Sequence, residues 1–132
     1  MTLCIDTNAY AAFKRGHKQI QELLEAADEI LVPTIVLGEL YAGFAIGSRE
    51  NANLRELARF LHTPGIAIAP VSEMVAERYG TLMRTLKTLG MPIPTNDVWI
   101  ASIALETGAR LLSLDAHFHR IPAVVYVPLD PL

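Results

Sequence analysis

Four acidic side chains stand at positions from which they could act together on one substrate. Asp6 and Asp115 each follow a short apolar run, so we expect each at the carboxyl end of a strand. In an open parallel α/β sheet, sites lie beyond these strand ends. Asp97 is expected in the first turn of a helix, where the partial positive charge favours a carboxylate. Glu39 interrupts an apolar helical segment, and a charge in such surroundings needs a partner.

The chemistry that such acids favour is hydrolysis assisted by hard metal ions. Carboxylates that are brought together repel one another, and each has its pKa raised. Divalent cations such as Mg²⁺ and Mn²⁺ relieve this repulsion because they prefer oxygen ligands. Two such ions about 3.5–4 Å apart can activate a water molecule and stabilise the leaving oxygen of a phosphodiester. The sequence has no His/Cys cluster at zinc spacing, which also favours Mg²⁺ or Mn²⁺.

Apolar periodicity predicts the elements that must position these acids. Short apolar runs predict strands at residues 3–5, 30–32, 66–69, 111–114 and 123–127. Helical spacing and capping residues predict helices at residues 8–15, 17–27, 34–46, 48–62, 72–89 and 97–107. Because helices separate strands that are continuous apolar runs, we predict an α/β fold. Its mostly parallel central sheet should have four to five strands, with helices on both faces.

The helical segments also carry expectations for single side chains. We expect Asn8 to cap the first helix. Trp99 lies in a helix that is apolar nearly all round, so we expect it in the core rather than as a platform for stacking bases. In the helix at 48–62, helical spacing predicts an apolar face made of Leu54, Leu57, Ala58 and Leu61.

Length and composition are typical of one globular domain. The chain has 132 residues, enough for one core and too few for two. It has no uninterrupted apolar run of about 18 residues and no basic region before an N-terminal apolar stretch, so we expect neither a membrane span nor a secretion signal. Cys4 is the only cysteine, and we expect it to be a small buried hydrophobe in a cytoplasmic protein. The hydrophobic share of 52% suggests a partner or a homodimer interface.

Charge neither excludes a nucleic-acid substrate nor argues for one. The net charge of the chain is −3. When the four candidate site acids are set apart, however, 10 of the 14 acidic residues remain against 11 Lys and Arg residues. Lys14, Arg15 and Lys18 are candidate phosphate contacts, with an ordinary solvated surface as the equal alternative. His117 and His119 follow Asp115 closely, and we expect them in a solvated loop because metal-assisted hydrolysis needs no histidine.

Four segments carry these acids in order along the chain. They are Ile5-Asp6-Thr7-Asn8, Gly38-Glu39-Leu40-Tyr41-Ala42-Gly43, Asn96-Asp97-Val98-Trp99-Ile100-Ala101 and Leu112-Ser113-Leu114-Asp115-Ala116-His117-Phe118. Together they resemble the signature segments of PIN domains, and more narrowly those of the VapC-type toxins of toxin–antitoxin pairs. The order, the spacing and the total length match, so the resemblance covers essentially the whole chain as a single domain, residues 1–132.

The resemblance implies a parallel sheet flanked by helices and Mg²⁺- or Mn²⁺-dependent cleavage of structured RNA such as tRNA or rRNA. It also implies a homodimer and a cognate antitoxin protein whose tail occupies the active-site groove. The catalytic and metal-binding acids of the family are matched by Asp6, Glu39, Asp97 and Asp115. In such proteins the fourth position is either Asp or Asn. The polar positions beside the acids are matched by Thr7, Asn8 and Ser113.

Two other functions remain open at this point. An aspartate-based phosphoryl-transfer domain also places acids at strand ends, but it usually has a second acid two residues further on or a lysine after a late strand. Here Asn8 stands two residues after Asp6, and no lysine follows Lys87. A non-catalytic binding module with the PIN fold is the other alternative, and the presence of all four acids argues against it.

Overall fold

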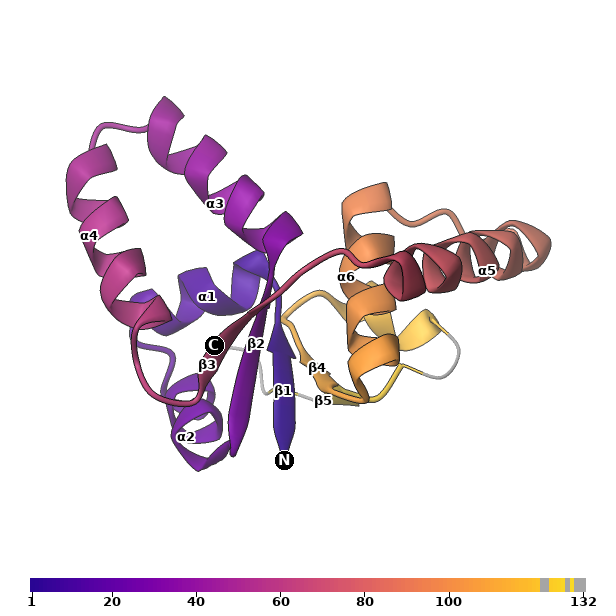
Figure 1. Ribbon diagram of the computed structural model, residues 1–132, viewed down its shortest axis with the longest axis horizontal. Helices are drawn as coiled ribbons and strands as arrows, with labels where there is room; N and C mark the ends of the chain where they lie inside the picture. The colour runs from indigo at the N-terminus through magenta and orange to yellow at the C-terminus, as the bar shows by residue number, and fades with distance from the viewer. Residues whose placement is uncertain (122–123, 128, 130–132) are drawn as a thin grey trace.

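Within the described residues, 1–121, 124–127 and 129, the computed structural model has a five-stranded parallel sheet at its centre. The strands are β1 (Thr2–Ile5), β2 (Glu29–Pro33), β3 (Ile66–Ala69), β4 (Arg110–Leu112) and β5 (Tyr126–Val127). Their order is β3-β2-β1-β4-β5, and every pairing is parallel. β1 therefore lies in the middle of the sheet (Figure 1).

Helices connect the strands, as parallel pairing requires. They are α1 (Thr7–Lys14), α2 (Lys18–Ala26), α3 (Thr34–Ile46), α4 (Glu50–Leu61), α5 (Glu73–Leu89), α6 (Thr95–Thr107) and a short 3₁₀ helix, η1 (Ala116–Arg120). In Figure 1, α3 and α4 form one arm of the molecule, and α5 and α6 lie on the opposite side of the central strands. In the part of the chain that is described, no helix is both long enough and apolar enough to cross a bilayer.

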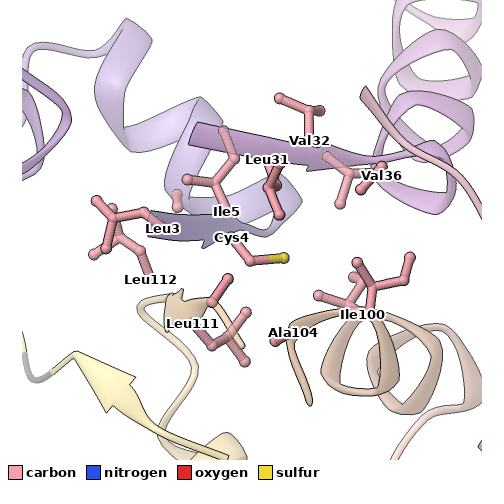
Figure 2. Close-up of a cluster of buried hydrophobic side chains, with 14 of the residues drawn as sticks. Leu3, Cys4, Ile5, Leu31, Val32, Val36, Ile100, Ala104, Leu111 and Leu112 are labelled. Carbon is pink, nitrogen blue, oxygen red and sulfur yellow. The ribbon is translucent and has the colours of Figure 1, made fainter. Parts of the chain in front are cut away.

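Both faces of the sheet are buried. Cys4 of β1 and Leu111 of β4 are paired in register and point toward Ile100 and Ala104 of α6 (Figure 2). Leu3 alternates with Cys4 along β1, so its side chain points to the other face, and both are 0% exposed. The predicted α/β fold with a parallel sheet covered on both faces is confirmed.

The predicted elements agree with the observed ones, apart from some ends. Helix boundaries differ by at most two residues, and η1 occupies a segment expected to be a loop. β4 ends at Leu112 rather than at 114, because Ser113 turns the chain as described below. β5 covers only Tyr126–Val127 of the predicted 123–127, and Ala123 lies outside the described residues. The prediction that Asn8 caps α1 is wrong, because Asp6 is the cap and Asn8 lies inside the first turn.

The buried face of α4 differs from the predicted one. Leu57 and Phe60 are buried, whereas Leu54 is 36% exposed and Ala58 is exposed. Phe60 explains the difference, because its ring packs against Tyr10 and Phe13 of α1 with centroid separations of 5.1 and 5.4 Å. The aromatic contact rotates α4 so that Phe60, rather than Leu54, faces the core.

Candidate active site

Asp6 follows β1 directly and is a buried residue whose two carboxylate oxygens both accept hydrogen bonds. Its side chain is 3% exposed. The Oδ1 atom accepts a hydrogen bond from the backbone N–H of Ala9 at 2.8 Å, which caps α1. The Oδ2 atom accepts a hydrogen bond from the hydroxyl of Ser113. Because each carboxylate oxygen carries two lone pairs, both oxygens keep the capacity to accept a further donor or a cation.

Ser113 reaches Asp6 because β1 and β4 are parallel neighbours. Their register pairs Ile5 with Leu112, so the next residues of the two strands leave the sheet side by side. Ser113 is fully buried, and its Oγ atom also accepts a hydrogen bond from the backbone N–H of Asp115 at 2.9 Å. This second bond turns the chain after β4. One hydroxyl therefore fixes the positions of both strand-end aspartates.

The two residues after Asp6 orient two further acids. The Thr7 hydroxyl donates to Oε1 of Glu39 at 2.6 Å, across to α3. The Asn8 side-chain amide donates to Oδ2 of Asp115 at 2.9 Å. Three consecutive residues after β1 thus connect to α3 and, twice, to the turn that follows β4. The polar positions predicted beside the acids, including Ser113, are all in contact with them.

Asp97 completes the group from the first turn of α6, where it is half-buried. Its negative charge and that of Asp115 both act to raise the pKa of Asp6, so both of these aspartates lie within electrostatic range of Asp6. Glu39 is also half-buried and joins the group through its bond from Thr7. The structure therefore brings the four predicted acids to the same edge of the sheet.

Burial dominates the electrostatics of this site. The pKa of Asp6 is raised from 3.8 to about 6, and burial is the largest cause. The charges of Asp115 and Asp97 act in the same direction, whereas the hydrogen bonds from Ser113 and Ala9 act to lower the pKa. Burial, together with the charge of Asp6, also raises the pKa of the Cys4 thiol to about 12. Cys4 is 0% exposed, so its expected role as a small buried hydrophobe is confirmed.

The raised pKa of Asp6 predicts a pH dependence of stability in the metal-free protein. A carboxyl whose pKa rises on folding binds a proton more tightly in the folded chain than in the unfolded chain. Protonated Asp6 therefore adds to the free energy of unfolding below about pH 4, and this contribution is lost as pH rises through about 6. A shift of about two units corresponds to about 3 kcal/mol. Denaturant unfolding in EDTA from pH 4 to pH 7 measures this loss, and Asp6→Asn should lack it. An equal decline in Asp6→Asn would contradict the assignment to Asp6.

The donor set fits a hard divalent cation. The groups that converge are carboxylates, oriented by two hydroxyls and one amide N–H, and carboxylate oxygens are ligands that Mg²⁺ and Mn²⁺ prefer. Among the described residues, no three His, Cys, Asp or Glu side chains form a ready-made metal cluster. Magnesium usually keeps several waters and is bound through one or two carboxylates, so a tight cluster of three is not required. Asp6 and Asp115 are held relative to each other by the shared Ser113 hydroxyl, and Asp97 and Glu39 lie at the same edge of the sheet, so all four acids remain candidate ligands.

The candidate phosphate-contacting residues lie away from the acids. The ammonium of Lys14 is 3.2 Å from a carboxylate oxygen of Glu56 on α4, an ion pair that sequence spacing does not signal. Arg15 and Lys18 are exposed at the junction of α1 and α2. Since α1 has eight residues at about 1.5 Å each, its far end lies about 12 Å along the helix from Asp6. These cations are therefore too distant to contact a phosphate held at Asp6.

The aromatic and imidazole side chains near the acids have ordinary surroundings where they are described. Trp99 stacks on Tyr79 of α5, with ring centroids 3.7 Å apart and planes 13° from parallel, so one face of the indole is covered within the protein. This arrangement agrees with the predicted core role. His119 is exposed on η1, and the side chain of His117 lies outside the described residues.

Comparison with known proteins identifies the family of this chain. The family model described as PIN domain matches residues 3–124. Ribonuclease VapC2 of Rickettsia felis is 32% identical over 130 residues, covering 95% of this chain and 96% of that protein. Ribonuclease VapC1 of Haemophilus influenzae strain R2866 is 31% identical over 127 residues, covering 92% of each.

Solved structures give the same result. VapBC2 from Rickettsia felis, bound to a DNA fragment from its promoter, superposes with a TM-score of 0.87 at 28% identity, over 96% of this chain and 98% of that chain. VapBC-1 from nontypeable Haemophilus influenzae superposes with a TM-score of 0.86 at 25% identity, over 96% and 97%. The chain therefore belongs to the PIN domain family, in the group of the VapC ribonucleases.

Proposed function

We propose that this chain is a metal-dependent endoribonuclease and the toxin of a toxin–antitoxin pair. The observation that carries the proposal is the arrangement at the end of β1, where Asp6 is bonded to Ser113 and its two following residues hold Glu39 and Asp115. The curated relatives are named ribonucleases, and the solved relatives are VapBC complexes, which supports both parts.

In this proposal Asp6, Glu39, Asp97 and Asp115 are the catalytic and metal-binding acids, with Mg²⁺ or Mn²⁺ as the cation. A bound divalent cation supplies Lewis acidity that stabilises charge developing on the phosphodiester and lowers the pKa of water. Ser113 and the N–H of Ala9 hold the Asp6 carboxylate in one orientation. Thr7 keeps Glu39 directed at the same edge of the sheet. Asn8 donates to Oδ2 of Asp115 and so orients the carboxylate that would hold a cation.

The partners in this proposal are a folded RNA of the tRNA or rRNA class, a cognate antitoxin and a second copy of the chain. A cytoplasmic location belongs to the same proposal, because those RNAs act there.

Support for a protein–protein interface comes from large apolar side chains exposed on α3 and at the start of α5. These side chains are Ile46 at 88%, Met74 at 55% and Tyr41 at 46% exposure. Apolar surface of this kind marks interaction sites.

Phosphoryl transfer through Asp6 is disfavoured by the burial of this residue. A phosphate-accepting aspartate must be reached by the phosphorus atom of a bulky phosphate donor, whereas Asp6 is only 3% exposed. A metal-binding role is compatible with the hydrogen bonds that Asp6 accepts, because the remaining lone pairs can coordinate a cation.

Metal binding and metal-dependent cleavage together test the proposed function. Mn²⁺ at about 100 times its dissociation constant should raise the free energy of unfolding by about 2.7 kcal/mol, measured as an increase in Tm. Cleavage of bulk tRNA should stop in EDTA and return with excess Mg²⁺ or Mn²⁺. The variant Asp97→Asn should show neither the increase in Tm nor the cleavage, while remaining folded by circular dichroism.

The exposed residue Asp28, which precedes β2 at the opposite end of the strands, provides the matched control. Asp28→Asn also removes one carboxylate and should keep both responses to metal. Wild-type protein that neither gains stability in millimolar Mn²⁺ nor cleaves RNA would overturn the proposal in favour of a non-catalytic module.

A further inference from the structure

The exposed side of α4 carries basic side chains in a regular pattern. Arg55, Arg59 and His62 are four and three residues apart, which places them on one face of the helix. All three are exposed, and they lie on the side of α4 away from Leu57 and Phe60, which pack on the core. We call these three residues the α4 basic face.

The charges on this face are not explained by helix stability. Like charges one turn apart destabilise a helix. The helical neighbours of Arg55 at three and four residues are Asn51, Ala52, Ala58 and Arg59, none of which is acidic. Arg59 has Glu56 three residues before it, but that carboxylate is 3.2 Å from the ammonium of Lys14. Among the described residues neither arginine has an ion-pair partner, so both guanidinium groups remain available for an external anion.

The α4 basic face adjoins other exposed cations. Phe60 packs against Phe13, and Glu56 pairs with Lys14, so α4 runs beside the end of α1. Arg15 and Lys18 follow directly at the junction of α1 and α2, and both are exposed. Figure 1 shows α4 and the end of α1 near α2 on the same side of the molecule. Four exposed arginine and lysine side chains therefore lie on this side of a chain whose net charge is −3.

We infer that the α4 basic face binds the phosphate backbone of the RNA substrate at a distance from the bond that is cleaved. This inference rests on the proposed function. The acids at the end of β1 repel phosphate in the absence of cations, so affinity for RNA must come from cations elsewhere on the protein. Arginine is suited to this contact because its guanidinium group can donate two parallel hydrogen bonds to a phosphate. An extended anionic backbone matches cations spaced along a helix.

The position of this face beside the far end of α1 sets a minimum length for the RNA. The far end of α1 lies about 12 Å along the helix from Asp6. Stacked nucleotides rise about 3.4 Å each, so a strand must continue for about four nucleotides beyond the cleaved bond to reach this region. A folded RNA meets this condition, whereas a trinucleotide does not.

The double variant Arg55→Ala/Arg59→Ala tests the inference without a risk to folding, because both side chains are exposed and alanine favours helix. Its dissociation constant for bulk tRNA, measured in EDTA so that no cleavage occurs, should increase by about tenfold. The slope of log K against log salt concentration should decrease in magnitude by about 1.4–1.8, as expected for the loss of two phosphate contacts. Binding of a trinucleotide should be unchanged.

The control Arg84→Ala/Lys87→Ala removes the same charge from exposed positions of α5 and should bind tRNA like the wild type. Equal loss of tRNA binding in both double variants would show a general charge effect and overturn the inference. Loss of antitoxin binding with unchanged tRNA binding would overturn it in favour of a protein interface. Binding in EDTA tests the α4 basic face, and cleavage in Mg²⁺ tests the proposed function, so the two claims can fail independently. A wild type that does not cleave would refute the proposed function separately.

Discussion

Asp6→Asn is expected to reduce metal-stimulated RNA cleavage by at least about 10³-fold and, at the same time, to stabilise the protein. Asparagine keeps the cap on α1, because its side-chain oxygen can accept the hydrogen bond from Ala9 as Asp6 does. It removes the negative charge that a cation would need. The fold should therefore survive while the chemistry is lost.

The gain in stability follows from the surroundings of the same carboxylate. At pH 7 Asp6 is ionised although burial raises its pKa to about 6, so the folded chain carries a charge that is poorly solvated and lies near two other aspartates. Removing that charge should raise the free energy of unfolding at pH 7 by up to about 3 kcal/mol. Such an opposition between stability and activity is common at functional sites.

Initial cleavage rates in Mg²⁺ and denaturant unfolding in EDTA measure the two effects on the same preparations. Asp28→Asn serves as the matched control and should retain full activity, since Asp28 is exposed and distant from the acids. An Asp6→Asn variant that is inactive and also less stable than the wild type would show that the carboxylate has a structural role instead.

Phe60→Ala is expected to have the largest effect on stability, a loss of about 3–5 kcal/mol. The ring is 9% exposed and makes an edge contact with Tyr10 and a tilted contact with Phe13, so truncation removes apolar area and two aromatic contacts at once. These contacts attach α4 to α1. Their loss should therefore also increase hydrogen exchange along α4 more than in the central strands.

Leu54→Ala in the same helix is the appropriate comparison, because Leu54 is 36% exposed. It should cost less than about 1 kcal/mol in urea unfolding, as surface substitutions usually do. If Leu54→Ala were the more damaging of the two, α4 would bury the face that helical spacing alone predicts, and the observed packing of Phe60 would be wrong.

The parts of the fold that depend on local sequence could be predicted. Leu3, Cys4 and Ile5 form a continuous apolar run, which is the pattern of a central parallel strand, and they are all 0% exposed. Glu39 could be recognised because a charged side chain within an apolar helix requires a partner. The structure provides that partner in Thr7, at 2.6 Å.

The parts that depend on long-range packing could not be predicted. The contact between Ser113 and Asp6 arises from the register of β4 on β1, and no local pattern specifies a register between strands so far apart in the chain. The face of α4 was predicted wrongly at Leu54 because α4 offers two overlapping apolar stripes, and only the rings on α1 decide between them. Lys14 likewise has its partner on a different helix.

The central position of β1 has a consequence during synthesis. Its neighbour β2 leaves the ribosome soon after it, whereas its other neighbour, β4, leaves much later. Ser113, which follows β4, is synthesised 107 residues after Asp6, and Asp115 is synthesised 107 residues after Asn8. A nascent chain that has not reached this point has only part of the acidic group, and Asp6 has no hydroxyl partner. We therefore expect products truncated before Ser113 to cleave no RNA under conditions in which the longer chain does, because part of the acidic group and its hydroxyl partner are missing.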